Sequence, residues 1–252
     1  STNEIQQFFH SAGQKAIEVS DLGADLMIYD VERHRSFTDS LVYGDTYMET
    51  FPAWSPNGKD LYFTRAQGYR QGMPLDSIRY DLCRVSFDTA TEKLGAPEIV
   101  FQASTQYKSV SFPCISPNGK YLMFVLSDYG NFSIWHPESD LHLMDLTTGE
   151  IRRLVEVNSD DVDSYHTWSS NGHWFVFSSK RMDGLWARPY FAAFNPETGE
   201  TGKPFLLPQE NPLFYDSYTY TYNRPELNKE PVKNGKDFEQ INSRKAIQAS
   251  GR

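Results

Sequence analysis

The residues best suited to metal chemistry are His136, Asp140 and His142, which lie close together in the sequence. Imidazole and carboxylate groups bind Zn²⁺ and related ions, but such sites use three or four protein ligands. Residues 140–145 are predicted to form a strand, so Asp140 and His142 would share one face of it while His136 lies in the preceding loop. No third ligand is evident. We therefore predict no metal and no cofactor.

Other signatures of catalysis or ligand binding are incomplete. The acidic stretch 158–163 offers oxygens that Ca²⁺ would accept, but the D-x-[DN]-x-[DN]-G pattern is missing, so a solvated loop is favoured. The sequence holds no G-x-S-x-G, P-loop or G-x-G-x-x-G motif, which removes support for a serine hydrolase or a nucleotide-binding protein. We favour a protein without catalytic activity, and we expect Cys83 and Cys114 to be buried thiols.

The elements that position these residues are predicted by an internal repeat. Segments 51–63, 112–124 and 165–177 align without gaps, and each carries a Ser-x-Asn-Gly turn followed by alternating apolar residues. Asn and Gly tolerate positive φ and suit a tight turn, and the alternation is typical of a strand. Each segment is therefore predicted to form a β-hairpin.

A second module follows each hairpin and completes a unit of four antiparallel strands, which is the pattern of a propeller blade. The chain is predicted to be all-β, with helix minor and confined to the ends. The predicted strands lie near 59–64, 79–87, 98–101, 120–126, 140–145, 151–155, 173–178 and 189–194. The propeller is predicted over 1–222, with a partial blade at 1–45, full blades at 46–103, 104–157 and 158–207, a closing strand at 215–222, and a polar C-terminal tail at 223–252.

The first unit is predicted to be incomplete, because residues 1–16 contain no Ser-x-Asn-Gly turn. Three blades and a fraction do not make an ordinary ring, since propellers have four or more blades. In one solution, strand 215–222 joins strands 17–30 and 38–43 to close a fourth blade. In the other, which we favour, the chain is the C-terminal part of a larger propeller whose further blades cover the exposed faces.

The hairpin pattern F-P-x-[WI]-S-P-N-G-K resembles the WD40-like repeat, or PD40 repeat, of TolB-type propellers. The third copy departs from it at His166, Ser170 and His173. The stretch 164–209 resembles the C-terminal part of TolB-like envelope propeller proteins of Bacteroidetes. This resemblance implies further blades upstream and a location in the periplasm or cell envelope. Propellers of the TolB type also include lyases with a metal bound by histidines.

Blade geometry places the links between strands two and three on one face, and the links between blades lie on the same face. Asn57, Asn118 and Asn171 lie on the opposite face. Propellers usually bind their ligands on the face that carries the links. The candidate binding residues there are Arg65, Tyr69, Arg70, Tyr129, Trp135, His136, Tyr165, His166, Arg181, Trp186 and Arg188. Arginines and aromatics are typical of interaction hot spots. For Trp135 and Trp186, packing between neighbouring blades is the commoner role.

The composition narrows the possible partners. The 252 residues carry a net charge of −9, which argues against nucleic acid or an anionic membrane surface as the main partner, and no apolar run is long enough for a transmembrane helix. Two hypotheses remain. The first is a non-enzymatic envelope scaffold that binds a protein partner. The second is a carbohydrate-binding or sugar-active propeller, which clustering of His136, His142 and His166 would favour.

Overall fold

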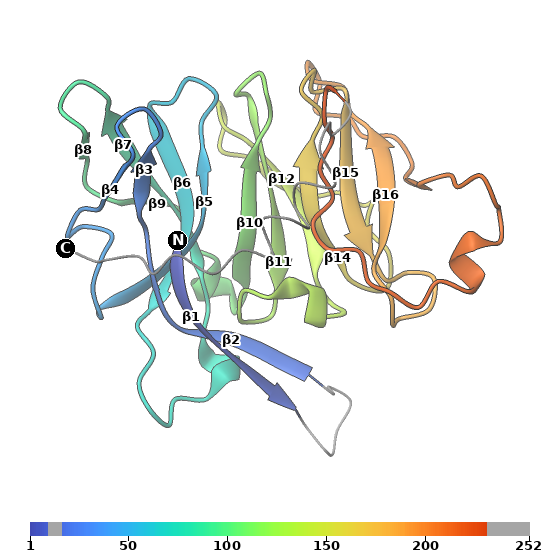
Figure 1. The fold of residues 1–252 in the computed structure, drawn as a ribbon, viewed down its shortest axis with the longest axis horizontal. Helices are drawn as coiled ribbons and strands as arrows, with labels where there is room; N and C mark the ends of the chain where they lie inside the picture. The colour runs from blue at the N-terminus through green and yellow to red at the C-terminus, as the bar shows by residue number, and fades with distance from the viewer. Residues whose placement is uncertain (10–16, 231–252) are drawn as a thin grey trace.

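The computed structural model describes residues 1–9 and 17–230 of the chain, and these residues form antiparallel β-sheets that stand side by side (Figure 1). The first blade contains β5 (Tyr47–Trp54), β6 (Asp60–Gln67), β7 (Asp81–Asp88), β8 (Lys93–Leu94) and β9 (Glu98–Phe101). The second blade contains β10 (Ser109–Ile115), β11 (Tyr121–Ser127), β12 (Asp140–Asp145) and β13 (Ile151–Arg153). The third blade contains β14 (Asp163–Trp168), β15 (Trp174–Ser179), β16 (Arg188–Ala193) and β17 (Phe205–Leu206). The eight strands predicted from the sequence are all present, with ends that differ by a few residues.

The Ser-x-Asn-Gly turns form for the local reasons that the sequence indicates. In the first blade, the Gly58 amide donates to the Ser55 carbonyl oxygen at 2.9 Å, and the Lys59 amide donates to Asn57 Oδ1 at 2.9 Å. Gly58 has φ of +69°, a conformation that glycine adopts without a steric penalty. The same turn recurs at Gly119 and Gly172, so one short motif sets the hairpin of every complete blade.

The N-terminal residues form two small sheets. β1 (Thr2–Phe9) pairs with β2 (Ile17–Asp25), and β3 (Ile28–Asp30) pairs with β4 (Arg35–Phe37). β1 and β2 pair antiparallel although residues 1–16 lack the turn sequence of the repeat. The expected strand at 38–43 does not form. The Val42 amide donates to the Asp39 carbonyl oxygen and the Leu41 amide to the Asp39 carboxylate, so these residues form a turn instead.

The strand predicted at 215–222 is also wrong. Phe214–Asp216 is a 3₁₀ turn, and the following tyrosines stack on one another, with the Tyr218 and Tyr222 rings 5.3 Å apart. The Tyr222 amide donates to the Ala187 carbonyl oxygen of the third blade. A run of alternating tyrosines forms a strand only where an open strand edge accepts its backbone, and this run lies against side chains and loops of the third blade.

The end of the chain follows the third blade for some residues. Thr167 Oγ1 donates to the Pro225 carbonyl oxygen at 2.6 Å, and Ser178 Oγ to that of Asn223 at 3.1 Å. The rest of the predicted tail, residues 231–252, lies outside the described residues. The described helical segments are short 3₁₀ turns rather than terminal helices: Leu75–Ser77, Ala103–Gln106, Ser133–Trp135 and Phe214–Asp216. None of the helical segments described is long and apolar enough to cross a membrane.

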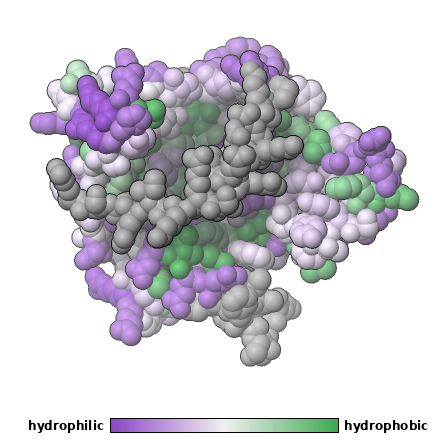
Figure 2. All heavy atoms as spheres, viewed as in Figure 1, coloured by the Kyte–Doolittle hydropathy of each residue, from purple (hydrophilic) through white to green (hydrophobic). Residues whose placement is uncertain are grey.

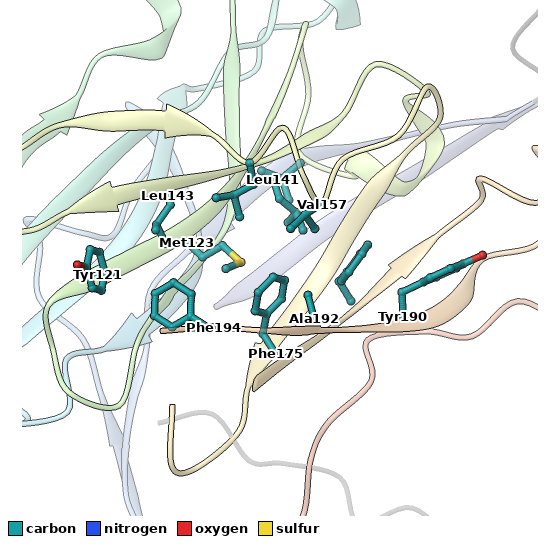
Figure 3. Close-up of a cluster of buried hydrophobic side chains, with 12 residues drawn as sticks. Tyr121, Met123, Leu141, Leu143, Val157, Phe175, Tyr190, Ala192 and Phe194 are labelled. Atoms are coloured by element: carbon teal, nitrogen blue, oxygen red, sulfur yellow. The ribbon is translucent and has the colours of Figure 1, made fainter. Parts of the chain in front are cut away.

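The hydrophobic core lies between neighbouring blades. Figure 3 shows Met123 and Leu141 of the second blade facing Phe175 and Phe194 of the third, and all four are 0–3 % exposed. Full burial of such side chains contributes about 1.5–3 kcal/mol each. Hydrophobic atoms are visible in the recessed middle of the molecule, while hydrophilic residues dominate much of its rim (Figure 2).

Candidate binding face

The three long links between strands two and three lie together at one end of the blades. The Gly130 amide of the second link donates to the Ile78 carbonyl oxygen of the first at 2.8 Å, and Lys180 Nζ of the third lies 4.6 Å from the Trp135 ring of the second. Asn118 lies at the other end, where its side chain donates to the Pro196 carbonyl oxygen at 2.9 Å. The predicted division of the loops between two faces is therefore confirmed, and we call this end the link face.

Three of the predicted arginines on this face are structural. Arg65 contacts Glu49 at 2.9 Å, Arg181 contacts Asp163 at 2.6 Å, and Arg188 contacts Asp183 at 2.9 Å. Each carboxylate belongs to the same blade as its arginine: Glu49 lies in β5, Asp163 in β14, and Asp183 in the link between β15 and β16. These side chains are 3–18 % exposed: Arg181 and Arg188 tie the third link to its own blade, while Arg65 and Glu49 pair across the neighbouring strands β5 and β6.

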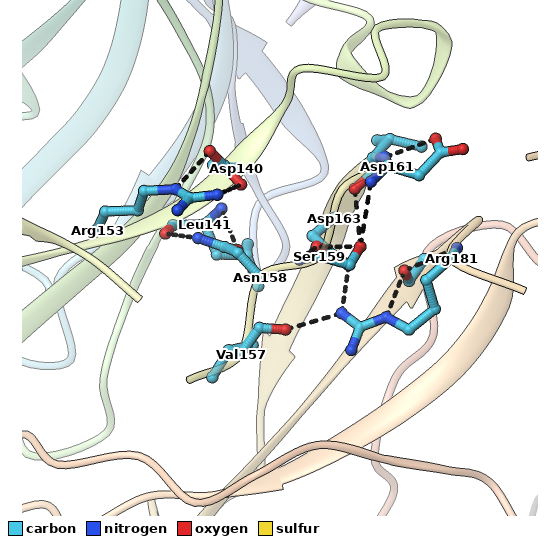
Figure 4. Close-up of polar contacts among 11 residues, drawn as sticks. Asp140, Leu141, Arg153, Val157, Asn158, Ser159, Asp161, Asp163 and Arg181 are labelled. Carbon is cyan, nitrogen blue, oxygen red and sulfur yellow. Dashed lines mark hydrogen bonds and ion pairs between the residues drawn. The ribbon is translucent and has the colours of Figure 1, made fainter. Parts of the chain in front are cut away.

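The ion pair of the third blade belongs to a dense network at the junction with the second blade (Figure 4). Asp163 Oδ2 accepts hydrogen bonds from the amide and hydroxyl of Ser159, while Arg181 also donates to the Val157 carbonyl oxygen. The nearby Asn158 side chain pairs with both backbone groups of Leu141, as a strand would. The acidic stretch predicted to be a solvated loop is thus partly internal, because Asp163 is fully buried.

His136 and Tyr129 hold the N-terminal strand β2 rather than an external ligand. His136 is 1 % exposed, with Nδ1 3.1 Å from Glu138 and Nε2 3.8 Å from Glu18 of β2. Tyr129 donates to Glu18 at 3.0 Å, and burial together with this carboxylate raises the pKa of the tyrosine. Further along β2, the Asn131 amide donates to Asp21, which is fully buried. The middle of the link face is therefore covered by the chain itself.

The other histidines lie apart. His166 is fully buried and donates from Nε2 to the Met123 carbonyl oxygen at 3.0 Å, and burial lowers its pKa to about 3, so it is neutral at pH 7. His142 stacks on Phe124, the residue that follows Met123 and points to the opposite side of β11. Within residues 1–9 and 17–230, no group of three His, Cys, Asp or Glu side chains could hold a metal ion.

A column of aromatic rings lies along the inner strands of the three blades. Phe51, Phe112 and Tyr165 occupy the same repeat position and have φ of +51°, +52° and +55°, in a bulge that interrupts each pairing of strands one and two. The Phe51 and Phe112 ring centroids are 4.0 Å apart, and those of Phe112 and Tyr165 4.9 Å. Left-handed backbone at a bulky residue is costly and often marks a functional position. Of the three, only Tyr165 was singled out from the sequence, although all three begin their repeat.

The link of the third blade presents the most apolar surface on this face. Leu185 is 67 % exposed and Met182 47 %, next to the half-buried Trp186. The Asp183 carboxylate accepts hydrogen bonds from the Leu185 and Trp186 amides and from Arg188, which fixes the shape of the link. Of the remaining predicted residues, Arg70 is exposed, while Tyr69 and Trp135 pack against buried clusters.

The fold is similar to that of solved β-propellers. An oligogalacturonate lyase in complex with manganese matches with 14 % identity and a TM-score of 0.50, over 76 % of this chain and 50 % of that one. TolB from Acinetobacter baumannii matches with 15 % identity and a TM-score of 0.45, over 73 % of this chain and 39 % of that one. The Dos1 propeller matches with 13 % identity and a TM-score of 0.46, over 77 % and 45 %. The matched regions thus span half or less of these proteins.

No protein-family model matches the sequence, and no curated protein matches it. At such low identities the structural matches bear on the fold alone. Together with the four-stranded antiparallel sheets, the match to the oligogalacturonate lyase confirms the prediction of an all-β chain that forms part of a propeller.

Proposed function

We propose that this protein is a non-enzymatic binding scaffold of the periplasm or cell envelope, which recognises a protein partner through the link of the third blade. The observation that carries the proposal is the pairing of apolar exposure with a fixed backbone in this link. Leu185 and Met182 project into solvent, while Asp183 holds the backbone beneath them. A pre-ordered apolar loop loses little conformational entropy on binding, which is what a protein interaction site needs.

The surroundings of this link support a protein partner. The Lys180 ammonium lies over the Trp135 ring and Lys180 is only 8 % exposed, so this contact helps to fix the base of the link below its apolar tip. The central part of the face is covered by β2 through Glu18 and Asp21. The links of the first and third blades remain accessible, and the third carries the exposed apolar side chains Met182 and Leu185. The periplasmic location rests on the resemblance of the repeat to TolB-type propellers.

Photo-crosslinking tests this proposal. A photoreactive amino acid at Leu185 should give a discrete protein adduct in cells of the source organism, and the same group at Thr148, in a turn at the opposite end of the blades, should not. Leu185→Asp should abolish the interaction with the crosslinked protein without changing the melting temperature, because the side chain is exposed. Equal adducts at both positions would contradict the proposal.

A second function, carbohydrate binding, is favoured by a pocket on the outer side of the first blade. This cavity of about 490 Å³ is lined by Tyr47, Arg65, Arg79 and Tyr107, among other residues. Arg65 lies 4.6 Å from the Tyr47 ring and Arg79 5.8 Å from the Tyr107 ring, so flat rings and donor groups stand side by side. Titration calorimetry with acidic and neutral oligosaccharides tests it. Tyr107→Ala should remove the binding, and no heat with any sugar would exclude this function.

A further inference from the structure

The junction between the second and third blades shows how one blade receives the next. The Tyr121 ring of the second blade packs edge-on against Phe194 of the third, at 5.5 Å, and its hydroxyl donates to the Glu197 carbonyl oxygen. In the same hairpin, Asn118 donates to the Pro196 carbonyl oxygen, and Lys120 pairs with Glu197 at 2.5 Å. A Ser-x-Asn-Gly hairpin thus docks its aromatic residue and its turn onto the neighbouring blade.

The first blade carries the receiving half of the same junction. In the strand register, Ser86 pairs with Asp60 as Ala193 pairs with Trp174, so Phe87 corresponds to Phe194. The Trp54 and Phe87 rings meet edge-on at 5.2 Å and 60°, as the Trp168 and Phe194 rings do at 4.7 Å and 63°. The aromatic surface that receives Tyr121 in the third blade is therefore repeated in the first.

This second surface is only partly covered. The strands that cover part of it are β3 and β4, and Phe37 of β4 stacks against Phe87. Beside them lies a pocket of about 490 Å³, lined by the four consecutive residues 27–30 on one side and by Trp54, Leu61 and Phe87 on the other. Met27, Tyr29 and Trp54 are 44 %, 54 % and 43 % exposed.

The β3 strand has an open edge at this pocket. In the second blade, the corresponding strand β12 pairs with β11 on one edge and β13 on the other. Among the described residues, β3 pairs with β4 alone. An open edge next to an apolar slot is the arrangement by which extended segments add to a sheet, because backbone hydrogen bonds give affinity and side-chain pockets give specificity.

We propose that this slot receives a β-hairpin of the repeat's own Ser-x-Asn-Gly type, supplied from outside residues 1–252. Its second strand pairs antiparallel with β3, and an aromatic residue two positions after the turn glycine packs against the Trp54 and Phe87 pair, as Tyr121 packs against Phe194 where Phe194 meets Trp168. The hairpin supplies strands one and two of the blade whose strands three and four are β3 and β4. This surface is separate from the third-blade link on which the proposed function rests.

A peptide in trans tests the proposal with the full chain. A fluorescent peptide with the sequence of residues 112–127, carrying Cys114→Ser, provides a hairpin of the proposed chemistry, and its binding is followed by fluorescence anisotropy. Binding should weaken at least tenfold with Trp54→Asp in the protein or with Tyr121→Asp in the peptide. Trp174→Asp is the matched control, because Trp174 is similarly exposed at 41 % but lies on the opposite end blade, and it should leave binding unchanged. The proposal would be overturned if the wild type, Trp54→Asp and Trp174→Asp proteins bound the peptide equally, or if the wild type did not bind it.

Hydrogen exchange separates the other possible occupants. The β3 amides that point to the open edge, away from β4, should exchange quickly in the free chain and slowly with the peptide bound. Slow exchange in the free chain at all concentrations would mean that residues 231–252 already fill the slot. Protection that rises with protein concentration, with a dimer lost in Trp54→Asp, would assign the slot to a second copy. Either result contradicts the proposed occupant.

Discussion

The first and third blades each bury a carboxylate at the same repeat position and pair it with an arginine, yet the two pairs differ in how well they are satisfied. Asp163 accepts hydrogen bonds from Arg181 and from the amide and hydroxyl of Ser159. Glu49 has the Arg65 contact, and its Oε2 has no hydrogen-bond partner. Both are 0–2 % exposed. The comparison teaches that the loop preceding the strand, rather than the ion pair itself, determines how well a blade tolerates a buried charge.

Breaking the better-satisfied pair should have the largest effect. Asp163→Asn should destabilise the protein by about 3–5 kcal/mol, because it leaves Arg181 without its carboxylate in a largely buried position. Urea unfolding followed by circular dichroism measures this free energy.

Glu49→Gln is the matched change in the first blade. It should cost less, about 1–3 kcal/mol at pH 7, because the raised pKa leaves the Glu49 carboxyl partly protonated there and its Oε2 already lacks a hydrogen-bond partner. If Glu49→Gln were as costly as Asp163→Asn, the additional hydrogen bonds around Asp163 would not contribute to the free energy of unfolding.

The next effect is a dependence of stability on pH that comes from Glu49. Burial raises the pKa of Glu49 to about 7, although Arg65 opposes the shift. The folded state therefore keeps this proton while the unfolded state loses it, so the contribution to stability is full below pH 4.5 and is lost as the pH rises to about 7. The loss should be on the order of 3 kcal/mol.

The measurement is the difference in unfolding free energy between wild type and Glu49→Gln at pH 5 and pH 8. A difference is needed because His166 acts in the opposite sense: its lowered pKa removes stability as the pH falls below its unfolded value near 6.5. Wild type should lose stability relative to Glu49→Gln between the two pH values. A constant difference would show that Glu49 ionises at its ordinary pKa.

The sequence predicts those parts of the molecule that depend on local chemistry. The Ser-x-Asn-Gly turns and the strands after them follow from residues a few positions apart, such as Asn57 and Gly58. The predicted strand at 215–222 failed because alternation alone does not provide a neighbouring edge. The β1–β2 hairpin and its docking through Glu18 were not predicted, since their partners lie more than one hundred residues away.

The candidate binding residues show the same limit. Arg65, Arg181 and Arg188 were expected to face a partner, but each contacts a carboxylate that the fold places beside it. The spacing of Asp183 and Arg188 within one short link could have indicated their pairing. Glu49 and Asp163 share a repeat position, and aligning the blades for charge as well as for turns would have shown both.

The smallest effect is expected in the second blade, where Val110 occupies the position of Glu49 and Asp163 and the nearby charges lie on the surface. Lys108 and Asp128 approach to 2.6 Å, but their side chains are 43 % and 54 % exposed. Water and salt screen such a pair, so a double-mutant cycle of Lys108→Ala and Asp128→Ala should give a coupling energy below about 1 kcal/mol. The coupling should shrink further in 1 M NaCl, where the screening length is about 3 Å. A coupling energy as large as the cost of Asp163→Asn would mean that burial does not explain why the ion pairs of the blades differ in strength.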